Sequence, residues 1–325
     1  MTDVKIYDSV AELDASHRGA VLTVGNFDGV HLGHQRILRT ARALAHVSSS
    51  SVIAMTFEPH PLTLLRPEVA PARLTPWKEK TRYLGRAGAD AVVRLQTDWP
   101  LLSIPAEDFV REILVKRIHP SYIVEGPDFG FGRDRAGTVE TLEAMSERGG
   151  YRVHIVEPYR LTVGDASFVV SSTHVRECVA RGDVQTATLC LGRPYTLTGR
   201  VMHGEAEGRK LGYPTINLEI PDQLLPGEGV YAGVSEIEGR RRVAAISVGH
   251  RPTLGGSGVV VEAFLLSESA DLYHKLVHLE FHTFIRRQRR FDSRSELTAQ
   301  IADDIEKVKA AITPERLAGD ESTSD

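Results

Sequence analysis

Two histidines of this chain, His31 and His34, stand three residues apart, directly after a turn bounded by Gly25 and Gly29. Imidazoles at this spacing share one face of a helix that begins near His31. The first turn of a helix carries unpaired N–H groups and the positive end of the helix dipole, so it attracts anions. The two rings could donate hydrogen bonds to phosphate oxygens and stabilise the charge that develops as a phosphorus–oxygen bond breaks.

A strand and a helix must position these rings. Residues 20–24 form an apolar run without alternating polarity, typical of a strand buried on both faces of a parallel sheet. Apolar residues then recur at helical spacing from Ile37 to Ala45, which predicts a helix that begins near His31. The bland alternative, a surface helix that happens to start with His-x-x-His, is disfavoured by the glycine-bounded turn, where backbone can approach a ligand closely.

The rest of the first half alternates between strand and helix patterns. Strands are expected at 51–57, 90–95, 122–125 and 151–157, with helices beginning at Pro76 (capped by Thr75) and Pro105 and another at 138–148. This alternation predicts βαβ units in a doubly wound parallel sheet, whose ligands bind beyond the carboxyl ends of the strands. Three further segments are expected at such ends: Phe57-Glu-Pro-His-Pro61, loop 126–137, and Ser171-Ser-Thr-His-Val-Arg176 after a strand at 168–170. Each taken alone also fits a connector or a capped helix.

The second half has a different pattern. Strands at 195–201, 230–236, 242–248, 259–266 and 275–284 are separated by Gly and Pro, which predicts an antiparallel barrel. A late helix starts with the capping box Ser293-Arg-Ser-Glu296 and has an apolar stripe that should pack on the barrel. Loop 204–217 contains glycines and a basic pair but lacks the Walker spacing, so by itself it fits a flexible hairpin connection. Glu262 interrupts an apolar strand, which fits either a general base facing a cleft or an outward-facing strand residue.

Composition limits the function classes. The chain has 325 residues, 42% hydrophobic and 25% charged, which suggests two soluble domains. A net charge of −4 argues against nucleic acid as a partner, and no apolar run approaches the ~20 residues of a membrane span. Cys178 and Cys190 lie outside any metal-ligand pattern, so free thiols and a cytoplasmic location are expected. His274, His278 and His282 recur every four residues, but on a strand that disfavours a metal site.

The motifs together carry a resemblance. Gly-Asn-Phe-Asp-Gly-Val-His-Leu-Gly-His at 25–34 resembles the HxGH signature of the nucleotidyltransferase superfamily, in the form typical of bacterial bifunctional riboflavin kinase/FAD synthetases. The Phe-Glu-Pro-His-Pro segment, the Gly-x-Asp-Phe-x-Phe-Gly loop and Val-Ser-Ser-Thr-His-Val-Arg agree with that family's first half. Gly212-Tyr-Pro-Thr-Ile-Asn217 resembles its kinase loop, with Ile216 in place of the usual Ala; this side chain points either toward the nucleotide site or into the core. Pro127 and His274 are further departures.

The resemblance implies an α/β fold: a Rossmann-like nucleotidyltransferase domain at 1–190 and a riboflavin kinase barrel with a closing helix at 191–312. Residues 313–325 are polar, so their composition predicts a disordered tail. It implies phosphorylation of riboflavin to FMN and adenylylation of FMN to FAD. The partners are then the small molecules riboflavin, FMN and ATP with Mg²⁺, with no nucleic acid and no membrane; the oligomeric state stays open.

The resemblance also assigns residues to roles. The catalytic residues are expected to be His31, His34 and Glu262. The adenylyltransferase is expected to hold ATP and its phosphates with Gly25, Asn26, Phe27, Asp28, Gly33, Ser172, Thr173 and Arg176. Its flavin and nucleotide loops would contribute Phe57, Pro59, His60, Asp128 and Phe129. The kinase is expected to bind its nucleotide with Gly208, Lys210, Gly212, Pro214, Thr215 and Asn217, of which Thr215 and Asn217 would hold Mg²⁺.

Two other functions remain compatible with the residues. The nearer one is an HxGH transferase for another phosphorylated metabolite, with the barrel serving only to bind that metabolite. The more distant one is a non-catalytic flavin- or RNA-binding protein; a class I aminoacyl-tRNA synthetase fragment also has HxGH, but a KMSKS-like lysine loop is missing from the sequence. Turnover of riboflavin and ATP separates these functions from the first.

Overall fold

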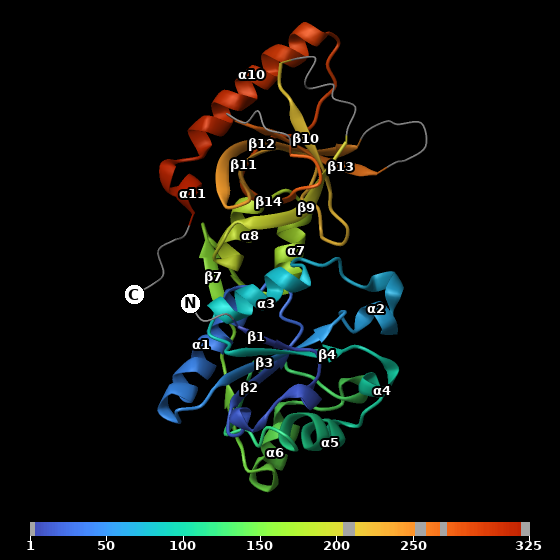
Figure 1. The fold of residues 1–325 in the computed structure, drawn as a ribbon, viewed down its shortest axis with the longest axis vertical. Helices are drawn as coiled ribbons and strands as arrows, with labels where there is room; N and C mark the ends of the chain where they lie inside the picture. The colour runs from blue at the N-terminus through green and yellow to red at the C-terminus, as the bar shows by residue number, and fades with distance from the viewer. Residues whose placement is uncertain (1–3, 204–211, 251–257, 267–271, 320–325) are drawn as a thin grey trace. The chain divides into compact units, whose positions relative to one another are not determined.

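The computed structural model describes residues 4–203, 212–250, 258–266 and 272–319. Contacts within the chain divide it into two compact units, residues 1–172 (the sheet unit) and 173–325 (the barrel unit). Figure 1 shows the order of the elements along the chain. Both expected architectures, a doubly wound parallel sheet and an antiparallel barrel with a closing helix, are confirmed.

The sheet unit is built on six parallel strands in the order β1-β4-β3-β2-β5-β6. The strands are β1 (Lys5–Tyr7), β2 (Val21–Gly25), β3 (Val52–Glu58), β4 (Ala91–Gln96), β5 (Tyr122–Glu125) and β6 (Arg152–Ile155). After β2 the chain adds β3 and β4 on one side, then returns to add β5 and β6 on the other. The order therefore reverses between β2 and β5, the place where doubly wound sheets bind ligands.

Helices cover both faces of this sheet. Its α-helices are α1 (Leu32–Val47), α2 (Leu62–Leu65), α3 (Trp77–Arg86), α4 (Trp99–Leu102), α5 (Ala106–Asp108) and α6 (Val139–Gly149), and a π-helical segment spans Phe109–Val115. Leu38 of α1 and Leu84 of α3 are buried with Val21 in one core, whereas Leu142 of α6 is buried with Leu22 in the other. Successive residues of β2 thus face opposite cores, which explains its uninterrupted apolar run.

Two expectations for this unit need correction. The strand expected at 168–170 is β8 (Ala166–Val169), which pairs only with β7 (Arg160–Val163) in an antiparallel hairpin outside the main sheet. Gly164, at φ 59°, provides the tight turn that joins the two strands. The helices expected to begin at Pro76 and Pro105 begin at Trp77 and Ala106, because each proline takes the capping position, Pro76 in place of Thr75.

The barrel unit contains six antiparallel strands that close in the order β10-β13-β12-β11-β14-β9. They are β9 (Tyr195–Met202), β10 (Thr215–Glu219), β11 (Gly229–Ile237), β12 (Arg240–His250), β13 (Val259–Leu265) and β14 (Leu276–Arg286). The sequence analysis missed β10, because glycines and a proline precede it and it is only five residues long. β10 matters for function because the last residues of the expected kinase loop form part of the barrel wall.

Among the described residues of the barrel unit, the helices are α7 (Ser172–Ala180), α8 (Val184–Leu191), α10 (Arg294–Ala311) and α11 (Pro314–Ala318). Val308 of α10 is buried against Ala232 and Val234 of β11, as the predicted apolar stripe requires, and Figure 1 shows α10 along the side of the barrel. The sequence analysis places the join between domains near residue 191; in the structure α7 and α8 lie in the same compact unit as the barrel, where Gly227 N–H donates to the Val179 carbonyl at 3.0 Å.

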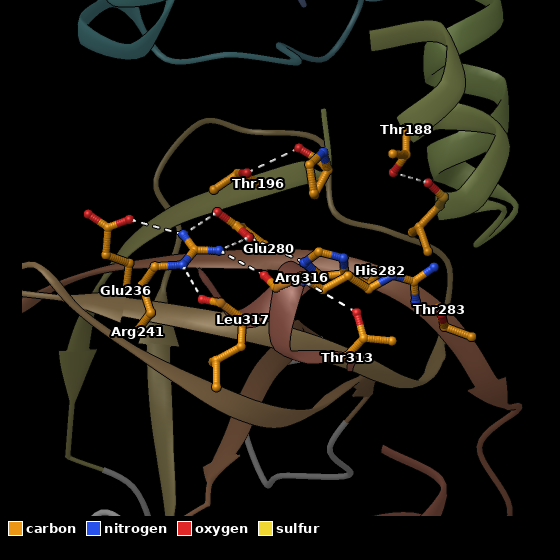
Figure 2. A network of polar contacts seen from close by, with 12 residues as sticks. Thr188, Thr196, Glu236, Arg241, Glu280, His282, Thr283, Thr313, Arg316 and Leu317 are labelled. Carbon is orange, nitrogen blue, oxygen red and sulfur yellow. Dashed lines mark hydrogen bonds and ion pairs between the residues drawn. The ribbon is translucent and has the colours of Figure 1, made fainter. Parts of the chain in front are cut away.

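A polar network fastens α11, within the expected tail, to the barrel (Figure 2). The Arg241 guanidinium donates two parallel hydrogen bonds of 2.8 Å to the Glu280 carboxylate and a third to the Leu317 carbonyl at 2.8 Å. His282 Nε2 lies 3.2 Å from the same carboxylate. Although burial raises the pKa of Glu280, the contacts with His282 and Arg241 outweigh it and hold that pKa below its usual value. The carboxylate therefore stays ionised where it joins α11 to β12 and β14.

Candidate active sites

The first candidate site begins at the N-terminus of α1. His31 caps this helix, and its Nδ1 accepts a hydrogen bond from the His34 backbone N–H at 3.4 Å. The two imidazole rings stack with centroids 3.7 Å apart and planes 21° apart. Because Nδ1 is the acceptor, neutral His31 carries its proton on Nε2, which is then a donor. The predicted helix start is confirmed, and it places two imidazoles at the positive end of the helix dipole.

The small residues of the signature make room for its rings. A Cβ on Gly33 would lie 3.0 and 3.1 Å from atoms of the His31 ring, and one on Gly25 would lie 3.2 Å from the Phe27 ring. Phe27 is only 2% exposed and meets His34 edge-on, with ring centroids 5.2 Å apart. The sequence analysis puts Phe27 in the ATP cradle; in the structure its side chain lies in the hydrophobic core, where its ring contacts His34.

The signature turn is tied to the loops that follow other strands. The Asp28 carboxylate accepts hydrogen bonds from Leu74 N–H at 2.9 Å and Thr75 N–H at 3.1 Å, and the Asp28 carbonyl accepts one from the Ser172 hydroxyl at 2.8 Å. The Asn26 side-chain amide nitrogen lies 3.1 Å from His60 Nε2. The structure thus brings together four expected site residues, Asn26, Asp28, His60 and Ser172. Asp28 joins the signature turn to the other loops through its hydrogen bonds.

An aromatic row leads away from the same edge of the sheet. Phe57 stacks with Phe109 at a centroid distance of 6.4 Å, Phe109 is 5.6 Å from Phe131, and Phe131 stacks with Phe129 at 5.2 Å. The two inner rings are buried and the two outer rings, which the sequence analysis assigned to the flavin loops, are half-buried. Pro59 is exposed, and the Asp128 carbonyl accepts a hydrogen bond from Arg135 at 3.3 Å, which folds loop 126–137 back on itself.

A buried carboxyl group that the sequence analysis missed lies where the strand order reverses. Glu125 ends β5 and accepts a hydrogen bond from Val24 N–H of β2 at 2.6 Å. Burial raises its pKa well above the usual range, and the bond from Val24 only partly opposes this. The signal available in the sequence was an acidic residue directly after the apolar pair Ile123-Val124.

Two expected polyphosphate ligands, Thr173 and Arg176, lie on α7 and belong to the barrel unit. Thr173 is exposed and Arg176 is half-buried, whereas Val175 and Val179 of the same helix are buried. The apolar face of α7 thus faces the protein, and its first turn carries a hydroxyl and a guanidinium. Their role in phosphate binding stays a prediction.

The second candidate site follows from the register of the barrel. Asn217 of β10 is the direct cross-strand partner of Glu262 on β13, and Glu262 is the partner of Ser247 on β12. Direct partners project from the same face of a sheet, so an amide, a carboxylate and a hydroxyl form one row across three strands. Val261 and Ala263, the chain neighbours of Glu262, are buried, so this row lies on the face opposite the core. Ser247, whose hydroxyl accepts a hydrogen bond from Gln288 at 2.8 Å, was not singled out from sequence.

The same register settles where Ile216 points. Its cross-strand partner is Ala263, which is fully buried, whereas its neighbour Thr215 pairs with Phe264 on the face of Glu262. Ile216 therefore lies on the core side of β10, away from Thr215 and Asn217. Tyr213 packs edge-on against Phe264, with ring centroids 5.6 Å apart, and joins the loop motif to the strand that carries Glu262.

Some expected kinase residues lie at or beyond the limits of the description. Gly208 and Lys210 lie outside the described residues. Gly212 adopts φ 84°, a conformation that favours glycine, and Pro214 is exposed just before β10. Within the described ranges no cluster of three or more His, Cys, Asp or Glu could hold a metal ion. The side chains of Thr215 and Asn217 offer a hydroxyl and an amide oxygen, donors that suit Mg²⁺.

Comparison with known proteins adds to this geometry. A family model described as FAD synthetase matches residues 13–174, and one described as riboflavin kinase matches residues 191–312. The bifunctional riboflavin kinase/FMN adenylyltransferase of Escherichia coli strain K12 is 36% identical over 291 residues, covering 89% of this chain and 92% of the relative. The protein of that name from Haemophilus influenzae is 37% identical over 294 residues, covering 90% and 94%. A solved structure titled macrolide-efflux protein, from Streptococcus pneumoniae, matches with a TM-score of 0.83 at 29% identity, covering 94% of this chain and 99% of the other.

A doubly wound sheet that matches the FAD synthetase model, and a closed barrel that matches the riboflavin kinase model, define a two-domain transferase of phosphate-containing groups. The chain belongs to the family of bifunctional riboflavin kinase/FMN adenylyltransferases. It phosphorylates riboflavin to FMN and adenylylates FMN to FAD, with ATP as the second substrate. Among the helices that the structure describes, none combines the length and hydropathy needed to cross a bilayer.

Proposed function

We propose that FAD is formed at the His31–His34 site and FMN at the Asn217–Glu262 site, with the adenylyltransferase domain at 1–190 and the kinase domain at 191–312. The observation that supports the first assignment most is the stacked pair of imidazoles at the N-terminus of α1. The observation that supports the second is the direct pairing of Glu262 with Asn217.

In adenylyl transfer, a phosphate oxygen of FMN attacks the α-phosphorus of ATP. A new phosphorus–oxygen bond forms, the bond between the α-phosphorus and the bridging oxygen breaks, and pyrophosphate leaves with the electron pair. The FMN phosphate is already anionic and needs no base, so the site has to align two anions and stabilise the departing charge. His31 Nε2–H, His34, the first-turn N–H groups of α1 and the Ser172 hydroxyl supply that stabilisation. The roles of Thr173 and Arg176 in phosphate binding rest on the sequence motif alone. Phe57 and Phe129 would contact the flavin ring.

In the kinase reaction, Glu262 accepts the proton of the riboflavin 5′-hydroxyl as that oxygen attacks the γ-phosphorus of ATP. The bond to the β,γ-bridging oxygen breaks and ADP leaves. Thr215 and Asn217 place their side chains on the same face as Glu262, because they are two residues apart on one strand. Pro214 and Gly212 shape the approach to that strand, and Gly208 and Lys210 belong to the phosphate loop.

Thr215 and Asn217 are the residues that would hold Mg²⁺, since a hydroxyl and an amide oxygen are hard donors. When bound, Mg²⁺ would neutralise charge on the ATP phosphates. Removal of divalent cations with EDTA should therefore stop FMN formation, and added MgCl₂ should restore it. FMN formation that persists in EDTA would contradict the assignment.

One assay tests the two site assignments together. The purified chain is incubated with riboflavin, ATP and MgCl₂, and separately with FMN in place of riboflavin, and the flavins are separated by chromatography. We expect Glu262→Gln to block FMN formation while FMN is still converted to FAD, and His31→Ala to do the reverse. Loss of both reactions from either single change would argue against separate sites.

A further inference from the structure

Helix α3 carries a buried ammonium group that the proposed reaction steps do not use. The Lys80 side chain is only 5% exposed, and its Nζ lies 2.7 Å from Glu58 Oε2 and 3.5 Å from the Asn26 carbonyl oxygen. Glu58 belongs to the Phe-Glu-Pro-His-Pro segment, and Asn26 belongs to the signature turn. One charged group thus contacts both loops that surround the paired histidines.

Burial lowers the pKa of Lys80, and the nearby Glu58 carboxylate opposes this most strongly. Glu58 is itself paired a second time, through Oε1, with Arg73 at 2.7 Å. Two cations and one carboxylate therefore lie at the carboxyl end of β3. An ammonium group is costly to remove from water, so its burial here has to be compensated by these contacts.

The Asn26 backbone is held from two sides. Its carbonyl accepts a hydrogen bond from the Thr56 hydroxyl of β3 at 3.1 Å as well as the contact from Lys80. The Asn26 side chain lies 3.1 Å from His60 Nε2, and His60 Nδ1 accepts from Leu62 N–H at 3.2 Å. The position of the signature turn relative to the second loop is thus set by a short chain of contacts that begins at Lys80.

A purely structural role would not need a charge at this position. Buried ion pairs often contribute little net stability, and apolar residues of similar volume can replace them. An ammonium group does, however, fix the distance between two oxygen acceptors on different loops. Misplacing reacting groups by about 1 Å can cost about 100-fold in rate.

We propose that Lys80 is a positioning residue for adenylyl transfer: its ammonium bridges Glu58 and the Asn26 carbonyl and so sets the signature turn against the loop that follows β3. The proposal rests on the placement of FAD formation at the His31–His34 site. The riboflavin kinase reaction of the same chain does not depend on this bridge and reports independently on protein quality.

The test compares Lys80→Met with Lys78→Met, a matched control because Lys78 is an exposed lysine on the same helix. Rates of FAD formation from FMN and of FMN formation from riboflavin are measured on each full-length variant. We expect Lys80→Met to lower kcat for FAD formation about 10- to 100-fold, with a smaller change in KM and unchanged FMN formation. Lys78→Met should match the wild type, and Lys80→Arg, which keeps the charge and its donors, should recover part of the lost kcat. An unchanged kcat in Lys80→Met would overturn the proposal.

The double variant Glu58→Met, Lys80→Met covers the case in which the single variant is damaged because the Glu58 carboxylate loses one of its two cation partners. Urea unfolding checks that its sheet unit folds as in the wild type. A folded double variant that still loses kcat supports positioning. One that regains wild-type kcat would show that only the altered charge balance at Glu58 mattered, and would overturn the proposal. His31→Ala in the same assay distinguishes failure of the Lys80 proposal from failure of the proposed site. If His31→Ala keeps full FAD formation, FAD is not formed at the His31–His34 site.

Discussion

Asn217 and Glu262 are direct partners across β10 and β13, so an amide and a carboxylate project side by side from one face of the barrel. Directly opposite residues in an antiparallel pair have Cβ atoms about 4.5–5.5 Å apart, close enough for both side chains to meet one substrate. The pairing is a property of the ladder, because a shift of one residue would move Glu262 into the core. The chemistry of this site is therefore specified by strand register.

Glu262→Gln keeps the shape of the side chain and removes its ability to accept a proton. General bases contribute about 10²–10⁴-fold to rates, so FMN formation should fall by that factor while FAD formation from FMN stays within about twofold. Separate assays of the two reactions measure this. Glu238→Gln is the matched control, since Glu238 is an exposed barrel carboxylate paired with Lys275 at 2.9 Å. If the two variants have equal kinase rates, Glu262 is not the base.

Ile216→Ala tests the direction in which this side chain points. Because Ile216 lies on the core side of β10, we expect the KM values for ATP and riboflavin to change less than about twofold. The barrel unit should lose about 1–3 kcal/mol of unfolding free energy, as expected for truncation of a partly buried aliphatic residue. Urea unfolding and steady-state kinetics measure the two effects. A large fall in the KM for ATP without loss of stability would place Ile216 in the nucleotide site.

The sequence was sufficient for elements with strong local signals. Residues 20–24 lie in β2 or directly before it, and His31 caps α1, because an apolar strand, a glycine-bounded turn and a periodic helix agree with one another. β10 was missed because its five residues follow a glycine-rich loop and resemble loop sequence. The strand at 168–170 was expected in the parallel sheet, but it pairs with β7. Periodicity predicts that a segment is a strand and does not predict its partner strand.

The contacts that organise the sites were harder to predict. Lys80 lies in Trp77-Lys-Glu-Lys80, a run that reads as a solvated helix face. Only its spacing from Trp77 and Leu84, three and four residues away, indicates that it shares their apolar face. The pairing of Ser247 with Glu262 depends on the register of two strands, which a single sequence does not specify.

His31→Ala should lower FAD formation about 100-fold or more, because one charged or polar donor at a developing oxyanion contributes a few kcal/mol to transition-state binding. FMN formation from riboflavin should be unchanged. Single-turnover conversion of FMN to FAD measures the effect without interference from product release. If His31→Ala keeps more than about a third of the wild-type rate of FAD formation, His31 does not take part in the reaction.

Gly33→Ala should also impair FAD formation, although glycine has no functional group. The new Cβ would lie 3.0 Å from the His31 ring and 3.4 Å from the Val170 carbonyl, so the imidazole has to move. We expect a fall in kcat of about 10- to 100-fold with kinase activity intact. The rates of FAD formation and of FMN formation are measured on one preparation of the variant. An unchanged kcat for FAD formation would show that the His31 ring can move without affecting the reaction.

The Glu280 contact predicts acid sensitivity of the barrel unit. The pKa of Glu280 is held below its usual value of 4.5, so its contribution to stability is fully present above pH 4.5 and is lost as the pH falls through the lower, folded-state pKa. The wild type should therefore exceed Glu280→Gln in unfolding free energy at pH 7, and the difference should shrink toward pH 3. Urea unfolding at several pH values follows this difference. Glu306→Gln, at an exposed site, is the control variant. A Glu280→Gln difference that stays constant from pH 7 to pH 3 would contradict the prediction.

The packing of the signature bears on how such a chain can change by descent. The His31 ring fills the space beside Gly33, and the Phe27 ring fills the space beside Gly25; Phe27 in turn packs edge-on against His34. These positions constrain one another, so a substitution tolerated at one depends on what occupies the next. In a lineage that lost FAD synthesis and kept only the kinase, selection would no longer act on any of these positions. We expect substitutions to accumulate at all of them together.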